Sequence, residues 1–292
     1  MKIDLKQLAE LSEEYEIRLP PPDFLTHLNY VECLNELSRN LILINKLNIR
    51  NKLEESKYLE KKMNLIKLTL KSIRGEYMEI SKNPDFAELC VSWISVKAYY
   101  LIFNLLLVLD YLITGQESSF ILSHNKSIEG FREYLTKKQL LFNKKIFNNN
   151  FLCLSILKLK VRPRANIKIV NFSLSERVVQ ILKKLIDYKL QEFKRTENIK
   201  NFRFKINKEK KKQFLQTHNV NLFEFFYWYR IKANYRDLEF LNKDISSKQF
   251  SDFYKNYFEL TINFLNAFVP ILNKLAEIRL GRRLFRYAPK IY

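Results

Sequence analysis

The chain has 292 residues, and its 51 basic and 31 acidic side chains give a formal net charge of +20 at pH 7. Only four glycines and seven prolines are available for tight turns, so long helices are favoured over a predominantly β fold. The sequence has no Walker loop, glycine-rich phosphate cradle or paired-carboxylate metal motif, which argues against a nucleotide-hydrolysing enzyme. This length suits one elaborated domain or two small ones.

The cysteines Cys33, Cys90 and Cys153 lie far apart and lack the spacing of metal ligands, which predicts buried free thiols in a reducing cytoplasm. The histidines do not cluster with them, and we expect neither a metal nor a cofactor. The N-terminus lacks the apolar core of a signal peptide. The longest apolar run, 98–113, is short for a bilayer and contains two polar residues, which predicts a core helix. We expect a soluble cytoplasmic protein without stable membrane insertion.

The first part of the chain is predicted to be helical. Apolar residues recur at helical spacing over 2–16, and three consecutive prolines follow that segment. Two further helices are expected at about 24–46 and 50–81, the second with Lys and Glu at helical spacing. We predict that residues 1–82 form an N-terminal helical extension, an antiparallel hairpin that is also a candidate oligomerisation arm.

The remainder, 83–292, is predicted to be a helical domain interrupted by a basic insertion at about 135–215. The expected helices of this part lie at about 86–114, 118–137, 173–195, 221–241 and 247–275. From Ile156 onward, Lys and Arg alternate with Leu and Val, a period of two that favours a β-hairpin with a basic outer face. The Lys- and Asn-rich stretch 196–212 is predicted to be a loop or a mobile segment. The predicted fold class is therefore mainly α.

The basic residues are grouped rather than scattered. No acidic residue occurs between Glu133 and Glu176, whereas compositional drift in an AT-rich genome, the alternative explanation, would disperse the cations. Such clusters attract polyanions. The candidate nucleic-acid-binding residues are Lys158, Lys160, Arg162, Arg164, Lys168, Arg203, Lys205, Lys208, Lys210, Lys211, Lys212, Arg282, Arg283 and Arg286. Phe202 and Phe204 are candidates for stacking on bases, the alternative being that they anchor a loop to the core.

A polar stripe occurs on the aromatic helix predicted at 221–241. Arg230, Asn234 and Asp237 occupy positions i, i+4 and i+7 of that helix and therefore share one face. An arginine beside an amide, with tyrosines near by, suits a phosphate oxyanion. The alternative is an ion pair of Asp237 with Arg230 or with Arg236 on a solvated face.

Three blocks of the chain, in order, resemble the HEPN superfamily, helical bundles named for nucleotide binding in higher eukaryotes and prokaryotes. Residues 97–103 (KAYYLIF) are similar to the first helix of that family. Residues 123–131 (SHNKSIEGF) are similar to its second helix, and 230–235 (RIKANY) to its Arg-x-x-Ala-Asp-Tyr element. The resemblance covers about 86–134 and 218–275, less than half of the chain.

This resemblance implies a dimer whose paired helices form a cleft, often a metal-independent endoribonuclease site. In active members an arginine holds the scissile phosphate and a histidine four to six residues later moves the 2′-hydroxyl proton. Arg230 matches the arginine, but Tyr235 stands where the histidine is expected, and a tyrosine, with a pKa of about 10, is a poor base. His124 is a candidate for the missing imidazole, and the alternative is that it is only a capping or core-edge histidine. The candidate catalytic residues are Arg230, Asn234, Tyr235 and His124.

Two hypotheses follow for the function. The first is a nucleic-acid-binding protein of a defence or toxin–antitoxin system, with RNA favoured over DNA, that also cleaves RNA without a metal. The second is a non-catalytic helical adaptor subunit of a nucleoprotein or defence complex, which binds nucleic acid or an acidic protein. The expected partners are a second copy of the chain and an antitoxin or another defence-complex protein. A third reading, membrane-surface binding by the basic and aromatic tail, is the least favoured.

Overall fold

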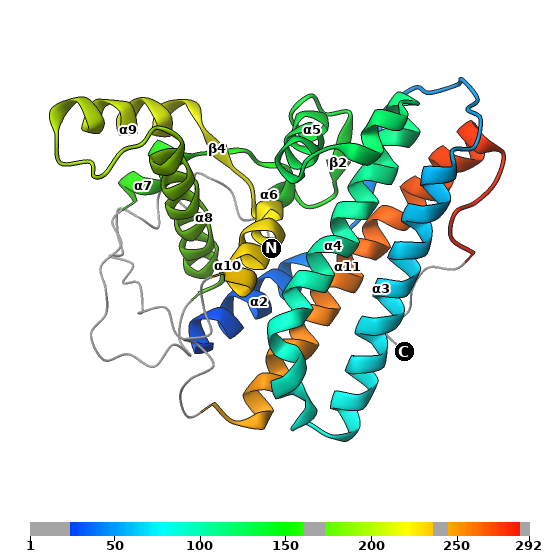
Figure 1. Cartoon of the computed structure of the whole chain (residues 1–292), viewed down its shortest axis with the longest axis horizontal. Helices are drawn as coiled ribbons and strands as arrows, with labels where there is room; N and C mark the ends of the chain where they lie inside the picture. The colour runs from blue at the N-terminus through cyan, green and yellow to red at the C-terminus, as the bar shows by residue number, and fades with distance from the viewer. Residues whose placement is uncertain (1–23, 160–172, 236–244, 287–292) are drawn as a thin grey trace. The chain divides into compact units, whose positions relative to one another are not determined.

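The computed structural model describes residues 24–159, 173–235 and 245–286, with the side chains of 232–235 left out. These residues are mainly α-helical, which confirms the predicted class (Figure 1). The described strands are two or three residues long and form two separate antiparallel pairs. The chain divides into two compact units, which we describe separately.

Unit 2 comprises Leu34–Lys144 and the described residues from Tyr229 onward. Its elements are α3 (Lys57–Lys82), α4 (Phe86–Thr114), α11 (Ser247–Leu280), α5 (His124–Thr136), the 3-10 helix η1 (Glu117–Ile121) and the strands β1 (Leu43–Asn45) and β2 (Leu140–Phe142). The three long helices, α3, α4 and α11, pack side by side (Figure 1). Strand β1 pairs with β2, with Leu43 opposite Phe142.

The core of unit 2 is built around α4, in which 19 of the 29 residues are buried. A helix that is apolar on most of its faces must be covered by neighbours, and α3 and α11 provide that cover. Gly115 ends α4 in the left-handed conformation, with φ of 76°. By length and composition α4 could cross a membrane, but 72% of its most apolar window is buried inside the protein, as the core-helix prediction requires.

Unit 1 takes its described residues from the ranges Met1–Cys33 and Lys145–Trp228. Its elements are α6 (Lys145–Asn148), β3 (Phe151–Leu152), α7 (Cys153–Lys158), α8 (Leu174–Thr196), α9 (Lys205–Thr217), β4 (Asn219–Val220) and the 3-10 helix η3 (Leu222–Glu224). Helices α2 (Phe24–Ser38) and α10 (Phe225–Tyr235) each contribute residues to both units. Helix α8 is amphipathic, and the apolar stripe that it buries from Val178 to Leu190 packs into the core of unit 1.

Two predictions for the basic insertion are wrong. The stretch 196–212 is not a loop throughout, because α9 begins at Lys205. The described start of the predicted hairpin, from Ile156 to Lys158, is the end of helix α7. Cys153 and Ile156 are buried three residues apart, which is helical and not strand spacing. The rest of that predicted hairpin lies outside the described residues.

Helix boundaries were also misjudged in the N-terminal part. The helix predicted at 24–46 ends at Ser38, and the chain then enters β1. The helix predicted at 50–81 begins at Lys57, capped by Ser56. The helix predicted at 2–16 lies outside the described residues. The predicted division at 82/83 differs from the division into compact units, since α3 and α4 both belong to unit 2. All three cysteines are free and buried, as predicted.

Candidate functional site

Arg230 lies against two tyrosines and close to a histidine within unit 2. Helix α10 carries the arginine, α4 carries Tyr99 and Tyr100, and His124 is the first residue of α5. The Tyr229 ring, immediately before Arg230, is buried against Phe253 and so fixes this part of α10 on α11. The burial of Tyr229 therefore fixes the position at which Arg230 contacts α4.

The guanidinium of Arg230 is held by aromatic groups. Its Cζ lies 5.2 Å from the centre of the Tyr99 ring and 5.3 Å from that of Tyr100. Its Nη2 donates a hydrogen bond of 3.3 Å to the Tyr100 hydroxyl. Ring faces attract cations, by about 0.5–2 kcal/mol depending on desolvation. These contacts orient the side chain without neutralising its charge.

No carboxylate among the described side chains forms an ion pair with Arg230, and its Nε is buried without a hydrogen-bond partner there. The ion pair with Asp237, considered from the sequence, lies outside the described residues. A guanidinium has five N–H donors in a planar fork, and this fork matches the oxygens of a carboxylate or a phosphate. Arg230 therefore has the features of an anion-binding residue.

His124 is connected to the arginine through Tyr99. The Tyr99 hydroxyl and His124 Nδ1 are 2.6 Å apart and share a hydrogen bond, and the imidazole packs on Phe103 with ring centres 4.3 Å apart. Partial burial, and to a lesser extent the positive charge of Arg230, lower the pKa of His124 below its usual value of 6.5. The imidazole is therefore mostly neutral at pH 7, the state in which it can accept a proton.

The local sequence explains the position of His124. Ser123 caps α5 by accepting a hydrogen bond from the backbone N–H of Lys126, so His124 begins the first turn. Ile128 and Phe131, on the buried face of α5, hold that helix in the core of unit 2. His124 is thus set at the edge of the core, half-buried, and not in solvent.

Two of the four candidate catalytic residues, Arg230 and His124, are brought together by the structure. The other two, Asn234 and Tyr235, lie in the last turn of α10, where side chains are not described. The sequence did not single out Tyr99, Tyr100 and Phe103 as site residues. Their place in a long apolar run made them look like core, and only the pair of adjacent tyrosines signalled otherwise.

The candidate nucleic-acid-binding residues are distributed over both units. Lys158 ends α7, and Arg203 precedes α9, which carries Lys205, Lys208, Lys210, Lys211 and Lys212. Lys160, Arg162, Arg164 and Lys168 lie outside the described residues. In unit 2, Arg282 is paired with Glu55 and Arg283 with Glu277, while Arg286 is exposed. Only part of the predicted set therefore presents an unpaired charge.

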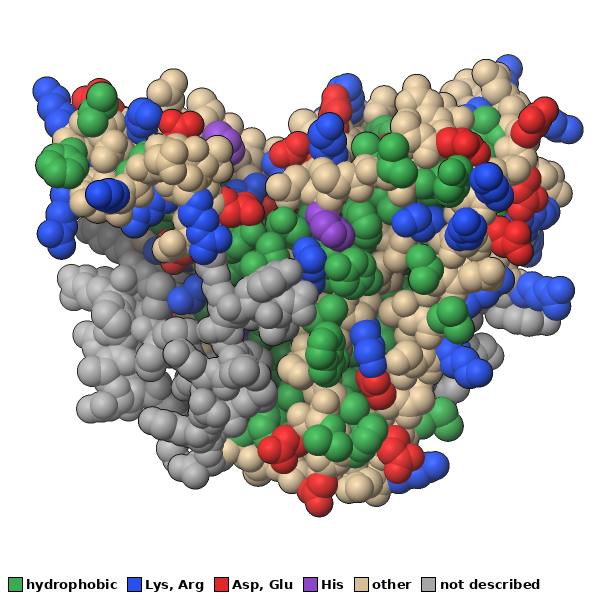
Figure 2. Space-filling view, viewed as in Figure 1, with side chains coloured by type: hydrophobic (Ala, Val, Ile, Leu, Met, Phe, Trp, Pro, Cys, Tyr) green, Lys and Arg blue, Asp and Glu red, His purple; other side chains and the backbone are tan. Residues whose placement is uncertain are grey.

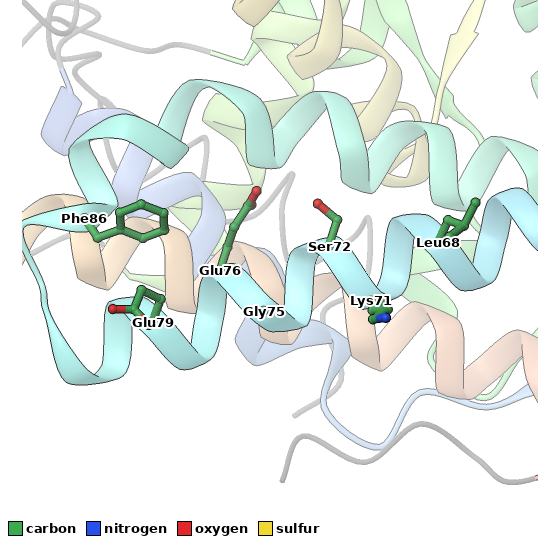
Figure 3. A pocket seen from close by; sticks show the side chains of 7 residues that line it. All are labelled: Leu68, Lys71, Ser72, Gly75, Glu76, Glu79 and Phe86. Carbon is green, nitrogen blue, oxygen red and sulfur yellow. The ribbon is translucent and has the colours of Figure 1, made fainter.

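A second surface feature of unit 2 is an open hollow of about 500 Å³ along α3, next to Phe86 at the start of α4 (Figure 3). Glu76 points from α3 toward α4 in this view, and its carboxylate pairs with Lys97 and accepts a hydrogen bond of 2.7 Å from the Tyr254 hydroxyl. Burial, with the nearby Glu76 charge, raises the pKa of Tyr254. The Glu76 carboxylate is thus engaged by other residues of unit 2, and we assign no ligand to the hollow.

Comparison with protein-family models, curated proteins and solved structures finds no match for this chain. Within the described residues, no group of three or more His, Cys, Asp and Glu side chains is placed to hold a metal ion.

Proposed function

We propose that the protein is an RNA-binding, HEPN-like endoribonuclease of a defence or toxin–antitoxin system, acting without a metal. The observation that carries this proposal is the coupling of Arg230 to His124 through the Tyr99 and Tyr100 side chains. An oriented guanidinium beside a neutral imidazole is what phosphodiester cleavage by an internal 2′-hydroxyl requires. The resemblance of the three sequence blocks to the HEPN superfamily supports the same reading.

In the proposed reaction Arg230 binds the non-bridging oxygens of the scissile phosphate. His124 takes the proton of the adjacent 2′-hydroxyl, and the 2′-oxygen attacks phosphorus. The bond from phosphorus to the 5′-oxygen breaks, and that oxygen is protonated from solvent. The products are a 2′,3′-cyclic phosphate and a 5′-hydroxyl. Since Tyr99 engages Nδ1, the proton would be exchanged at Nε2, and the Tyr99 hydroxyl would hold the imidazole in the matching tautomer.

The charge arrangement favours binding followed by proton transfer. The free site keeps the His124 pKa low, partly through Arg230. A bound phosphate brings negative charge next to both groups, which opposes the effect of the arginine and raises the basicity of the imidazole. The site would therefore become a better base when the substrate is in place.

A homodimer is part of the proposal, because the family resemblance implies one. Unit 2 exposes large apolar side chains suited to a self-contact, and Figure 2 shows hydrophobic side chains over α4. Leu89 and Trp93 lie one turn apart on α4, and Leu68 is exposed on α3. Trp93 is 57% exposed, so its replacement by Glu would not disturb the core. Sedimentation velocity of wild-type and Trp93→Glu protein tests this contact: a dimer that persists in the variant contradicts it.

The test of the enzymatic proposal is cleavage of a labelled single-stranded RNA in EDTA. Wild-type protein should give products ending in 2′,3′-cyclic phosphate, and a strand with 2′-deoxy sugars should stay intact. Loss of one oxyanion-binding group typically lowers rates about 10²- to 10³-fold, and we expect a loss of this order for Arg230→Gln. Loss of a general base typically lowers rates about 10²- to 10⁴-fold, which is the loss we expect for His124→Gln. Arg39→Gln removes an exposed arginine outside the site and should leave the rate unchanged.

The second candidate function is the non-catalytic adaptor. It is favoured by Tyr235, which replaces the histidine expected after Arg230. Salt-sensitive binding of RNA without any cyclic phosphate product would establish the adaptor and exclude the enzyme. Cleavage that is equally fast in Arg230→Gln would also exclude the proposed site.

A further inference from the structure

The exposed end of α9, in unit 1, combines large apolar side chains with many cations. Phe204, the N-cap residue of α9, is 66% exposed, and Ile206 in its first turn is 69% exposed. Figure 2 shows hydrophobic side chains among lysines and arginines over α9, at the upper left. Single exposed apolar residues are common on protein surfaces, but an exposed aromatic ring on a mainly basic surface, where Glu209 is the one acid of α9, is a binding feature.

The cations at this end of α9 outnumber the one acidic residue of that helix, Glu209. They are Arg203, Lys205, Lys208 and Lys212, all exposed. Among the described residues none of these four forms an ion pair, whereas Lys210 pairs with Glu197 at 2.9 Å. The first turn of α9 has no acidic residue and no side-chain cap, so the positive end of the helix dipole adds to their field. The surface is therefore complementary to a polyanion.

The two phenylalanines of this segment differ in availability. The ring of Phe202 is half-buried and has the Lys211 ammonium 5.3 Å from its centre. The ring of Phe204 has no such cover. Near its C-terminal end, α9 is anchored by Phe214. The centre of the Phe214 ring lies 4.4 Å from that of Phe193 and 3.8 Å from that of His218, and the rings are stacked. The helix is thus held at its C-terminal end, and it presents Phe204 at the other.

We propose that Phe204 stacks on an unpaired base of single-stranded nucleic acid, while the surrounding cations hold the phosphate backbone. The inference rests on the proposed function only in taking nucleic acid as the ligand, and it uses no residue of the Arg230 site. A duplex is excluded as the ligand of this ring, because its bases are already stacked on each other. Base–aromatic stacking tolerates any sequence, so the platform would bind single strands without base preference.

The experiment measures fluorescence anisotropy of an end-labelled, unstructured 2′-O-methyl RNA, which cannot be cleaved through its 2′-oxygen. Phe204→Ala should weaken binding about 5- to 150-fold, the range measured for loss of one stacked base. Its affinity for a duplex of equal length, and the slope of affinity against salt, should not change. Ile206→Ala is the matched control, since it removes an equally exposed apolar side chain without a ring, and it should bind like wild type.

Equal affinity of wild type and Phe204→Ala for the single strand would overturn the platform, as would no binding of that strand by wild type. Equal losses in Phe204→Ala and Ile206→Ala, with sedimentation of wild type on anionic phospholipid vesicles, would assign this surface to a membrane instead. Cleavage lost in Arg230→Gln is scored separately on ordinary RNA, so either proposal can fail while the other stands. Circular dichroism confirms that the variants are folded.

Discussion

Lys183 makes the stability of unit 1 depend on pH in a direction that can be predicted. Its side chain is in α8, the residue is only 8% exposed, and Nζ donates a 2.6 Å hydrogen bond to the Leu159 carbonyl. Burial lowers the pKa of Lys183 from 10.5 to about 8, against a smaller opposing effect of Asp187. Because this pKa is depressed in the folded state, the unfolded chain holds more protons between pH 8 and 10.5. The contribution of Lys183 to stability should therefore rise with pH across that window.

The magnitude follows from the two pKa values. Raising the pH from 7 to 9.5 should increase the contribution of Lys183 to the free energy of unfolding of unit 1 by about 2 kcal/mol, since each pKa unit corresponds to about 1.4 kcal/mol. In Lys183→Met this gain should vanish. The Leu159 carbonyl loses its donor in that variant, so the readout is the slope with pH and not the absolute stability.

The two tryptophans allow unit 1 to be followed alone. Trp228 is buried in unit 1, and Trp93 lies in unit 2. In a Trp93→Phe background, urea unfolding at pH 7, 8 and 9.5 can be followed by Trp228 fluorescence. Cysteines and some tyrosines of the unfolded chain also ionise by pH 9.5, but they do so with and without Lys183→Met, so the difference between the two pH profiles reports on Lys183. Parallel pH profiles for this background with and without Lys183→Met would refute the assignment of a depressed pKa to Lys183.

Two further predictions concern unit 2. Gly115→Ala should lower the free energy of unfolding by about 2 kcal/mol or more, because φ is +76° and the added Cβ would lie 2.8 Å from Leu53. Gly281→Ala, at φ of +71° with open space around it, should lower it by only about 1 kcal/mol through backbone strain. Urea unfolding compares the two variants. The pKa of His124, followed by NMR, should rise on addition of inorganic phosphate and also in Arg230→Gln, because each change reduces the positive field on the imidazole. A phosphate-induced rise that persists in Arg230→Gln would place the anion elsewhere.

The sequence predicted well those helices whose pattern is set by their own residues. Helix α4 was expected at about 86–114, and its bounds are Phe86 and Thr114. A long apolar run bounded by Asn-Pro-Asp and by Gly115 leaves few alternatives. Helix α8 was found equally closely, since Ser173 and Glu176 form a capping box at its start.

Where the prediction failed, contacts distant in sequence decided the structure. Strand β1 exists because 43–45 pairs with 140–142, and nothing local to either segment shows the partner. The Lys-rich stretch of α9 looked like a loop because so few of its residues are apolar. Lys, Glu and Gln are nevertheless good helix formers, and burial of Phe214 and Leu215 at one end is enough to hold the helix.

The candidate site shows the same division between local and distant information. Arg230 was identified from its own helix, and His124 only as a candidate. Whether an arginine is a structural ion pair or an anion site depends on what surrounds it, and the surrounding groups here come from α4. Tyr99 and Tyr100 hold the guanidinium by their ring faces and one hydroxyl, contacts that leave its positive charge uncompensated. A carboxylate in their place would orient the arginine equally well and would abolish its use for a phosphate. That the described neighbours of Arg230 are aromatic and not acidic is therefore the strongest structural argument that Arg230 serves a ligand and not the fold.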